Sequence, residues 1–306
     1  MTEPNTGSAA EADPIEPLVR RAQILVEALP YIQRFDNQTL VIKYGGHAMV
    51  DEQLKASVVQ DIVLLESVGM KVVIVHGGGP EISLLMKKIG KEPVFEAGYR
   101  VTDAETLTIT EMVLVGKINR EIVNGINQAG GRAVGLSGKD AGLIVARRYR
   151  PKGPDGVGET DIGYVGEVER INPEILGVLD EHEFIPVISP IGVDSHGQTL
   201  NINADTVAAD IAAALMASKL ILLTDVRGVL RDRNDPKSII PSLPSTECQK
   251  MINQATIAGG MIPKARACLR ALDGGVGKTH ILDGRIPHAL LLELFTDQGI
   301  GTQIVR

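Results

Sequence analysis

Three glycine-rich turns stand directly after short apolar runs of the sequence. They read KYGG (43–46), HGGGP (76–80) and TDVRG (224–228). In open α/β sheets, ligands bind at the carboxyl ends of the strands, where glycines expose backbone N–H groups and helix N-termini favour negative charge. A single Gly-Gly pair is most often only a turn, but three such turns in one chain predict a site for phosphate or another anion.

Two lysines lie close to such turns. Lys43 ends the first apolar run, and by residue type alone it is better explained as a surface lysine whose stem covers apolar surface. The adjacent glycines favour a role at the anion site instead. Lys264 ends the segment GGMIPK (259–264), in the first turn of a predicted helix. The helix dipole disfavours a cation there, so we expect an anion or an aspartate beside Lys264.

The segment NINAD (201–205) alternates polar and apolar residues and then opens a helix. Asn201, Asn203 and Asp205 can therefore share one face at a helix start. Helix capping explains one of the three, because Asn and Asp are favoured at that position. The other two remain candidates for ligand binding or for pairing with a lysine.

Two further motifs suggest other chemistry but lack the required context. GGVGKT (274–279) resembles a Walker A loop, yet Leu272 replaces the first glycine, and a predicted helix precedes the segment where a strand is required. HGGG (76–79) resembles an esterase oxyanion loop, but no G-x-S-x-G elbow is present, since residues 135–139 read GLSGK. No G-x-G-x-x-G motif supports a dinucleotide dehydrogenase.

The elements that must position these residues alternate between short β-rich runs and helical patterns, as in a buried parallel sheet. We predict strands at 39–43, 71–76, 132–136, 184–189, 219–224, 279–283 and 302–305. We predict helices at about 51–68, 80–89, 203–216, 245–255, 261–273 and 287–295. Residues 103–128 read as two helices hinged near Gly116, and 141–171 as antiparallel hairpins with a Gly/Pro-rich tip at 150–159. We expect two lobes on one continuous sheet.

The N-terminal region contains a polar tail and one amphipathic helix. Residues 1–13 lack periodicity and predict a frayed tail. From Pro14 onward, apolar residues recur at steps of three and four, which predicts a helix over 14–36. Such a helix can cap its own domain or pack against another subunit, and the sequence leaves both open.

The composition is that of a globular protein with one large or two lobed domains. The chain has 306 residues, a net charge of −7 and 44% hydrophobic residues. The negative charge argues against nucleic acid or an anionic membrane as main partner. Cys248 and Cys268 have neither metal-ligand spacing nor enough partners for a disulfide framework, and no signal peptide or membrane span is predicted. We therefore expect a cytoplasmic protein.

Six motifs, taken together, resemble a known family. KYGG, VHGGGP (75–80), GYRVTD (98–103), NINAD, LLTDVRGV (222–229) and GGMIPK occur in the order and spacing of the amino acid kinase family, in the branch that acts on N-acetyl-L-glutamate. The resemblance covers about residues 15–306. It implies a three-layer α/β/α sandwich with a mainly parallel central sheet. It also implies an acetylglutamate-binding lobe at 37–189 and an ATP-binding lobe at 190–306, in one continuous catalytic domain.

The implied reaction is ATP-dependent phosphorylation of the side-chain carboxylate of N-acetyl-L-glutamate, the second step of arginine biosynthesis. Mg²⁺ would accompany ATP, and no organic prosthetic group is implied. A carboxylate is already a nucleophile at neutral pH, so catalysis reduces to aligning two anions and neutralising charge on the transferring phosphoryl group.

The resemblance also assigns roles to residues. The implied catalytic residues are Lys43, Lys264 and Asp205, with the aspartate holding both lysines. The implied substrate-binding residues are Gly78, Gly79, Arg100 and Asn201, with Arg100 pairing the α-carboxylate in a bidentate fork. The implied nucleotide- and phosphate-binding residues are Gly45, Gly46, Thr224, Asp225 and Gly228. No individual metal ligand is predicted, because Mg²⁺ can be held mostly by phosphates and water.

The early helix and residues 280–305 resemble the arginine-inhibited members of this branch. The implied assembly is a homohexamer, a trimer of dimers joined by the N-terminal helix, and L-arginine is the implied inhibitor. His280, Glu293 and Gly299 are the candidate effector residues. Glu293 read alone is also explained as a solvated helix charge. A nitrogen-signalling regulatory protein is a further candidate partner.

Two alternatives differ in substrate or in class. Aspartate kinase, glutamate 5-kinase, carbamate kinase and uridylate kinase share the implied fold, but GYRVT and NINAD favour acetylglutamate, and we expect no regulatory domain after the nucleotide lobe. A non-catalytic arginine sensor is the alternative from another class. Such a binder would be free to lose Lys43, Lys264 or Asp205, yet all three are present.

Overall fold

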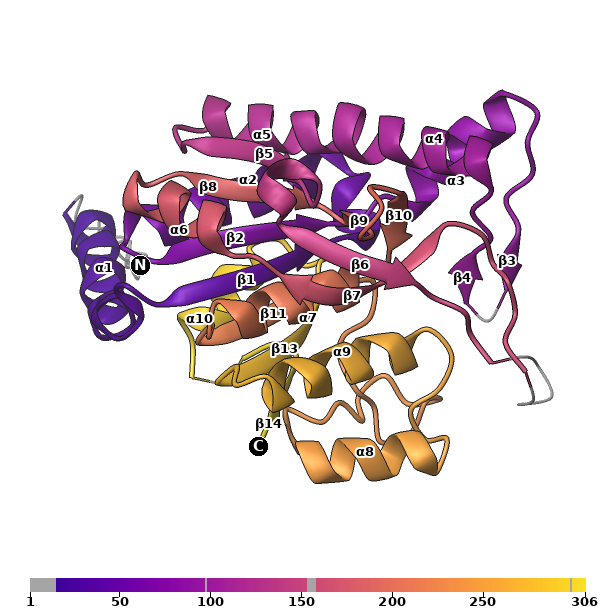
Figure 1. Ribbon diagram of the computed structural model, residues 1–306. Helices are drawn as coiled ribbons and strands as arrows, with labels where there is room; N and C mark the ends of the chain where they lie inside the picture. Colours follow the sequence, from indigo (N-terminus) through magenta and orange to yellow (C-terminus); the bar gives the residue numbers. More distant parts are fainter. Residues whose placement is uncertain (1–14, 97, 153–157, 298) are drawn as a thin grey trace, which may run out of the picture.

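The computed structural model describes residues 15–96, 98–152, 158–297 and 299–306. Its centre is an eight-stranded sheet in the order β12-β14-β13-β11-β1-β2-β8-β5 (Figure 1). All neighbouring pairs are parallel except β13 and β14. The strands are β1 Thr39–Tyr44, β2 Lys71–His76, β5 Ala133–Ser137, β8 Ile185–Ser189, β11 Lys219–Thr224, β12 Ser242–Pro244, β13 Lys278–Asp283 and β14 Thr302–Val305.

Alternate residues of the central strands enter two different apolar cores. In β1, Val41 belongs to one core, whereas Leu40 and Ile42 belong to the other. Both faces of the sheet must therefore be covered, which explains why these strands are continuous apolar runs. The mainly parallel three-layer α/β/α arrangement expected from the sequence is confirmed.

Helices supply the outer layers of the sandwich. The first core contains residues of α6 Glu174–Glu181, α7 Ala204–Ala214, α8 Ser245–Asn253 and α9 Met261–Asp273. The second contains residues of α2 Glu52–Ser67, α3 Gly79–Lys88, α4 Ala104–Glu111, α5 Asn119–Gln128 and α10 Ala289–Leu294. Most predicted helices and strands are confirmed with ends that differ by only a few residues.

The prediction of a hinge near Gly116 is wrong. A π-helical segment, Met112–Ile118, joins α4 to α5 and contains Gly116, so the helical run is continuous. Val113, Leu114 and Ile118 are all buried in the same core. A π turn is wider than an α-helical turn and takes up one extra residue. The apolar face of the run therefore stays against the sheet without a break at Gly116.

A second, smaller sheet lies beside the first. It contains β6 Ile144–Arg148, β7 Val165–Ile171, β9 Ile191–Val193 and β10 Thr199–Ile202, which close on themselves as a small barrel. The antiparallel β6–β7 pair confirms the hairpin expected in 141–171. The strands β9 and β10 and the short hairpin of β3 Phe95–Glu96 and β4 Tyr99–Arg100 were not predicted. Residues 1–13 and part of the tip at 150–159 lie outside the described residues.

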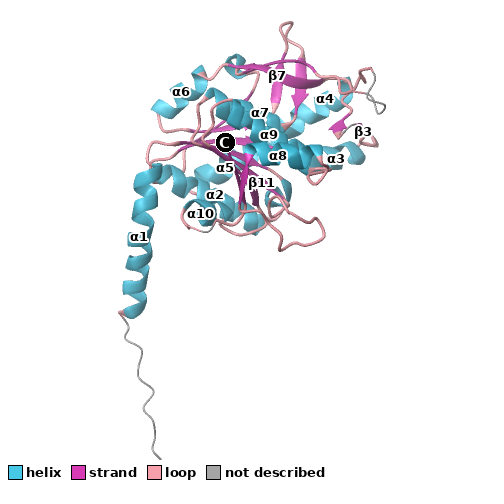
Figure 2. Cartoon of the chain, turned by 90° about the horizontal axis from the view of Figure 1, so that it is seen from below, coloured by secondary structure: helices cyan, strands magenta, loops and turns pink. Residues whose placement is uncertain are grey.

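The first helix, α1 Glu16–Phe35, projects away from the body of the molecule (Figure 2). Phe35 is its one buried residue, and Tyr31 and Phe35 pack edge-on against Phe295. The apolar stripe nearer the N-terminal end of the helix stays exposed, and the exposed fraction of Leu25 is 72%. This stripe is therefore not buried against the described part of its own chain.

Within the described ranges, no helix is both long enough and apolar enough to span a membrane.

Candidate active site

Parallel pairing brings the three glycine-rich turns together at one edge of the sheet. Tyr44 at the end of β1 is in register with His76 at the end of β2. On the other side of β1, Lys43 is in register with Leu222, two residues before β11 ends. The turns that follow these strands therefore begin side by side. The strands that follow β1 in the sequence are placed first on one side of it (β2, β5 and β8) and then on the other (β11 and β13). Ligands commonly bind α/β sheets at such a switch point.

Two lysines and an aspartate from different elements meet at this edge. Lys43 Nζ lies 3.1 Å from Asp205 Oδ1, and Lys264 Nζ lies 3.0 Å from Asp205 Oδ2. Lys43 belongs to β1, and Asp205 and Lys264 stand in the first turns of α7 and α9. The aspartate expected beside Lys264 is thus present. Lys43 and Asp205 are both buried, so Lys43 is not a surface lysine.

The charges of this cluster are unequal. Burial alone would raise the pKa of Asp205, but the ammonium groups of Lys43 and Lys264 outweigh it and lower that pKa to about 2. The carboxylate therefore stays ionised at neutral pH and neutralises only one of the two lysines. The surplus positive charge can stabilise an anion placed beside them.

The helix that carries Asp205 is capped by a neighbouring residue of the same motif. Asn203 is the N-cap residue, and its side-chain oxygen accepts hydrogen bonds from the backbone N–H groups of Asp205 and Thr206. Of the three polar residues in NINAD, Asn203 is therefore the one explained by capping.

Both glycines after Lys43 are closely approached by charged side chains. A Cβ atom on Gly45 would collide with Lys43 Nζ, and one on Gly46 would collide with the Asp225 carboxylate. Gly46 also has a φ of 76°, in the left-handed region that favours glycine. The first turn thus lies between the lysine cluster and the turn after β11.

A cavity of about 180 Å³ adjoins this edge of the sheet. Its lining includes all four predicted substrate-binding residues, Gly78, Gly79, Arg100 and Asn201. The start of α7, one residue before Asp205, also contributes to the wall. The cavity therefore adjoins the helix turn that carries the aspartate of the lysine cluster.

Arg100 supplies positive charge to this cavity. Its Nη2 donates to the Gly79 carbonyl oxygen at 2.9 Å and to Ser83 Oγ at 2.8 Å, and its guanidinium lies over the Phe95 ring. Burial lowers the pKa of Arg100 from its ordinary value. Among the described residues, no carboxylate lies within ion-pairing distance of this guanidinium. Its charge is therefore available to an anionic ligand.

A second cavity, of about 310 Å³, lies beside the turn after β11. Asp225 and Gly228 line it, as expected for the nucleotide site. Thr224 does not line it; its hydroxyl instead accepts from the Val226 N–H and shapes the turn. Gly228 has a φ of 144°, and a Cβ atom there would collide with Thr302 Oγ1.

Three arginines that the sequence interpretation did not select line the same cavity. They are Arg227, Arg233 and Arg285. Arg285 is held by two hydrogen bonds of 2.8 Å to the Asp283 carboxylate. Arg227 lies inside the TDVRG turn and could have been found there. Arg233 and Arg285 have no local pattern that distinguishes them from surface arginines.

The three candidate effector residues also lie together. His280 Nδ1 is 2.7 Å from Glu293 Oε1, and a Cβ atom on Gly299 would lie 2.9 Å from Glu293 Oε2. Glu293 Oε2 accepts a hydrogen bond from the Ile300 N–H at 2.7 Å. The Glu293 side chain is 6% exposed, so its interpretation as a solvated helix charge is wrong.

Lys219, which was not predicted, lies beside this group. Its Nζ is 3.4 Å from His280 Nε2 and faces the Phe35 ring at the end of α1. Burial and the nearby charges of Lys278 and Arg34 lower the pKa of Lys219 to about 8. This group of side chains therefore connects β11, β13, α10 and the C-terminal end of α1.

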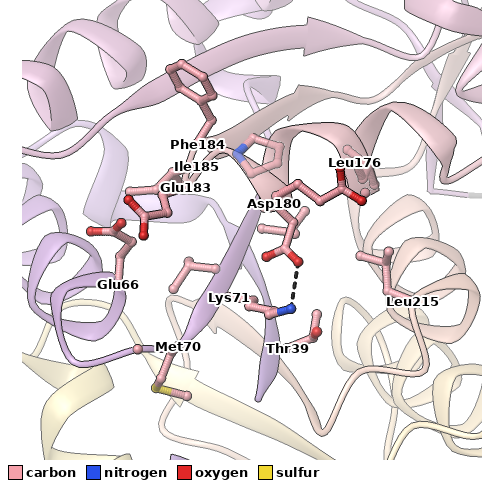
Figure 3. Close-up of a pocket in the computed structure, with 16 residues that line it drawn as sticks. Thr39, Glu66, Met70, Lys71, Leu176, Asp180, Glu183, Phe184, Ile185 and Leu215 are labelled. Carbon is pink, nitrogen blue, oxygen red and sulfur yellow. Dashed lines mark ion pairs between the residues drawn. The ribbon is translucent and has the colours of Figure 1, made fainter. Parts of the chain in front are cut away.

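Another cavity, of about 370 Å³, lies at the opposite edge, beside the amino ends of β1 and β2 (Figure 3). Lys71 and Asp180 form an ion pair of 2.7 Å within it, and the carboxylates of Glu66 and Glu183 also line it. None of the predicted site residues is among the described residues that line this cavity.

The described ranges contain no group of three or more His, Cys, Asp or Glu side chains that could hold a metal ion. The Asp205 carboxylate is already shared by two lysines. The side chains at this edge therefore fit Mg²⁺ that arrives with nucleotide phosphates better than a resident ion.

Known proteins are similar to this chain over most of its length. The model of the amino acid kinase family matches residues 38–283. The acetylglutamate kinases of Moorella thermoacetica and of a Nostoc species are each 56% identical to this chain. They align over 94% and 93% of this chain and over 98% and 93% of their own lengths.

Solved structures share the fold. An N-acetylglutamate synthase from Neisseria gonorrhoeae, in complex with coenzyme A and N-acetyl-glutamate, has a TM-score of 0.80 at 27% identity. The match covers 93% of this chain and 63% of the synthase. The same synthase in complex with coenzyme A and L-arginine has a TM-score of 0.77. A carbamate kinase from Giardia lamblia, at 15% identity, 88% coverage of this chain and 98% of its own, has a TM-score of 0.63. This chain belongs to the amino acid kinase family and, within it, to the acetylglutamate kinases.

Proposed function

We propose that this protein transfers the γ-phosphoryl group of ATP to the side-chain carboxylate of N-acetyl-L-glutamate, as a step of arginine biosynthesis. The observation that carries the proposal is the pairing of Lys43 and Lys264 with one buried aspartate, beside a cavity lined by Arg100 and the Gly77–Gly79 turn. The high identity to acetylglutamate kinases supports the choice of acceptor.

The acceptor is proposed to occupy the cavity of about 180 Å³. Arg100 would pair with its α-carboxylate through two parallel hydrogen bonds, with Nη2 exchanging its bond to Gly79 or to Ser83 for one to the ligand. Asn201 and the backbone of Gly78 and Gly79 would orient the rest of the molecule. This leaves the side-chain carboxylate at the end of the cavity nearest the lysine cluster.

Phosphoryl transfer then needs alignment and positive charge. A carboxylate oxygen of the acceptor forms a bond to the γ-phosphorus while the bond from phosphorus to the bridging oxygen of ADP breaks, and no proton moves. Lys43 and Lys264 would contact the oxygens of the transferring group, and Asp205 would hold both ammonium groups in place. Backbone N–H groups of Gly45 and Gly46 would add further donors.

The nucleotide is proposed to occupy the cavity of about 310 Å³. Asp225 and Gly228 line it together with Arg227, Arg233 and Arg285, which can neutralise phosphate charge. Thr224 would act through the shape of the turn. Mg²⁺ would enter bound to the phosphates of ATP. The proposed division is an acetylglutamate lobe at 37–189 and an ATP lobe at 190–306.

We also propose that L-arginine inhibits the enzyme by binding beside His280, Glu293 and Gly299. Support comes from the buried Glu293 carboxylate, which can pair with a cationic effector, and from the related synthase in complex with L-arginine. The exposed apolar stripe of α1 supports a homohexamer built through this helix. A cytoplasmic location fits two buried, unpaired cysteines. A nitrogen-signalling partner remains a prediction.

The acceptor assignment is tested by the variant Arg100→Ala. We expect KM for acetylglutamate to rise at least about thirtyfold while kcat changes little, because the lost pairing acts in the ground state as well as the transition state. Arg100→Lys should recover only part of the affinity, since an ammonium cannot form the bidentate fork. An unchanged KM for acetylglutamate in Arg100→Ala would move the acceptor to another pocket.

A further inference from the structure

A buried polar network lies next to the proposed acceptor cavity. It consists of His76 at the end of β2, Ser189 at the end of β8 and Asn119 at the start of α5, each with 0% exposure. None of the three lines the cavity. Burying polar side chains costs free energy unless they form hydrogen bonds, so the hydrogen-bond partners of these three residues matter.

The contacts of His76 define its tautomer. Its Nδ1 lies 2.9 Å from the carbonyl oxygen of Gly77, which can only accept, so Nδ1 carries the hydrogen. Its Nε2 is then an acceptor, with Ser189 Oγ at 3.0 Å and Asn119 Nδ2 at 3.3 Å as donors. Asn119 Nδ2 also donates to the Val187 carbonyl at 2.8 Å. Burial lowers the pKa of His76 to about 4, so the ring is neutral at physiological pH.

The π-helical segment places Asn119 in this network. The Asn119 N–H donates to the carbonyl of Leu114, five residues earlier, which is the hydrogen bond of a π turn. Leu114 itself lines the acceptor cavity, and its carbonyl oxygen is the second, more distant acceptor of the Ser189 hydroxyl, at 3.3 Å against 3.0 Å to His76 Nε2. Pro190, directly after Ser189, is another residue of the cavity wall. The network thus links three parts of the cavity wall, at Gly77, Leu114 and Pro190.

The hydrogen bond from His76 also sets the direction of one peptide group. The Gly77 carbonyl and the Gly78 N–H belong to the same trans peptide and point in opposite directions. The carbonyl is held toward the buried ring, and the Gly78 N–H makes no hydrogen bond to any described residue. A Cβ atom on Gly78 would lie within 2.6 Å of the side-chain ends of Leu114 and Ile118, so the backbone of this turn packs directly against these two residues.

We infer that His76 is a positioning residue: its Nδ1–H, fixed by Ser189 and Asn119, holds the Gly77 carbonyl and thereby presents the Gly78 N–H to the carboxylate acceptor. This inference rests on the proposed function, because it assigns the acceptor to the cavity beside Gly78. His76 acts through the turn and touches neither substrate.

Two substitutions at His76 distinguish the roles of its two ring nitrogens. The amide nitrogen of His76→Asn can occupy the place of Nδ1 and keep the hydrogen bond to Gly77, whereas the longer side chain of His76→Gln reaches the place of Nε2 and loses that bond. We expect His76→Gln to lower kcat/KM for acetylglutamate at least about tenfold, and His76→Asn to stay within about threefold of the wild type. KM for ATP should stay within about twofold in both.

Melting temperatures of both variants separate positioning from stability. Both substitutions remove the ring, so a merely structural role predicts equal losses of kcat/KM in the two variants, in step with their stability. Equal losses, or no loss in either, would overturn the inference. Wild-type protein that does not phosphorylate acetylglutamate would instead refute the proposed function.

A second variant serves if the histidine variants do not fold. Ser189→Ala removes the donor to Nε2 and leaves the ring intact. We expect kcat/KM for acetylglutamate to fall about threefold to tenfold, with KM for ATP unchanged. Ser67→Ala, at an exposed serine whose hydroxyl bonds only its own helix, is the matched control. An unchanged kcat/KM in Ser189→Ala would contradict the inference.

Discussion

At the scale of single residues, the central feature is one carboxylate shared by two lysines. Asp205 is buried and ionised, and it holds the ammonium groups of Lys43 and Lys264 at 3.1 and 3.0 Å. A single lysine would be fully neutralised by such a partner. Two lysines leave a net positive charge, and this is what the transfer of a phosphoryl group between two anions requires.

Replacing either lysine should impair the chemical step more than binding. We expect Lys43→Ala and Lys264→Ala each to lower kcat at least about a hundredfold, with KM values within about threefold of the wild type, because the lysines stabilise charge in the transition state. Steady-state kinetics measures both quantities. Lys250→Ala, at an exposed lysine of α8, is the control. Near-normal turnover in either site variant would remove that lysine from the mechanism.

The pKa of Asp205 gives a prediction for stability against pH. Since this pKa is lowered from 3.8 to about 2, the ionised carboxylate stabilises the fold above about pH 4, and the contribution is lost as pH falls toward 2. Asp205→Asn leaves two buried ammonium groups without their partner and should cost about 3 kcal/mol at neutral pH.

Urea unfolding of the wild type and of Asp205→Asn measures this difference. We expect it to stay constant from about pH 7 to pH 4 and to shrink below that. A difference that already shrinks near pH 6 would contradict the lowered pKa of Asp205.

The residues predicted from the sequence are mostly those beside glycine-rich turns. Lys43, Asp205 and Lys264 could be selected because each stands at a strand end or helix start. Arg233 and Arg285 could not, because their place in the nucleotide cavity depends on the pairing of β13 with β11 and on the long loop after β11. Thr224 was predicted to bind the nucleotide, but its hydroxyl accepts a hydrogen bond within the turn after β11.

At the scale of elements, the turn after β11 shows how tightly the nucleotide cavity is built. Gly228→Ala would place a Cβ atom against Thr302 and impose a φ of 144° on alanine, which should cost about 3 kcal/mol. Because the turn must shift, we expect KM for ATP to rise at least about tenfold, with KM for acetylglutamate within about twofold.

Gly197→Ala is the matched control for this prediction. Gly197 also has a positive φ, of 82°, but no atom lies where its Cβ would be, and it belongs to the turn between β9 and β10. This variant should lose about 1 kcal/mol of stability and keep both KM values. Equal effects of the two substitutions on KM for ATP would contradict the role given to Gly228.

The strands were easier to predict than the elements that shape the cavities. The central strands are buried on both faces, so their apolar runs stand out in the sequence. The π-helical segment has the same apolar spacing as an ordinary helix with a glycine in it. The strands β9 and β10 and the β3–β4 hairpin are short, and β10 pairs with β7, far away in the sequence. Their existence depends on tertiary contacts rather than on local pattern.

At the scale of the whole molecule, α1 is a long helix of which only Phe35 is buried by the described part of its own chain. Its apolar stripe is exposed over most of its length, and the contacts with Phe295 and Lys219 come from Tyr31 and Phe35 in its last two turns. An exposed amphipathic helix of this kind is expected to bury its stripe against another copy. The same last turn lies beside the candidate effector residues, so assembly and inhibition should depend on it together.

Deletion of residues 1–35 should therefore separate catalysis from assembly. We expect the shortened protein to keep kcat within about threefold, since no proposed active-site residue is removed, and to lose both the hexamer and strong inhibition by arginine. Light scattering and inhibition curves measure these properties. Hexamers that remain inhibited after the deletion would reject the role proposed for α1.

The most direct test of the central claim is a coupled ADP-release assay with ATP and Mg²⁺. The assay compares N-acetylglutamate, glutamate, aspartate and carbamate as acceptors, each with and without millimolar arginine. We predict turnover on N-acetylglutamate alone, suppressed by arginine. Turnover without suppression would support the proposed kinase reaction and reject the proposed arginine site. Turnover only on another acceptor, or on none, would contradict the proposed reaction.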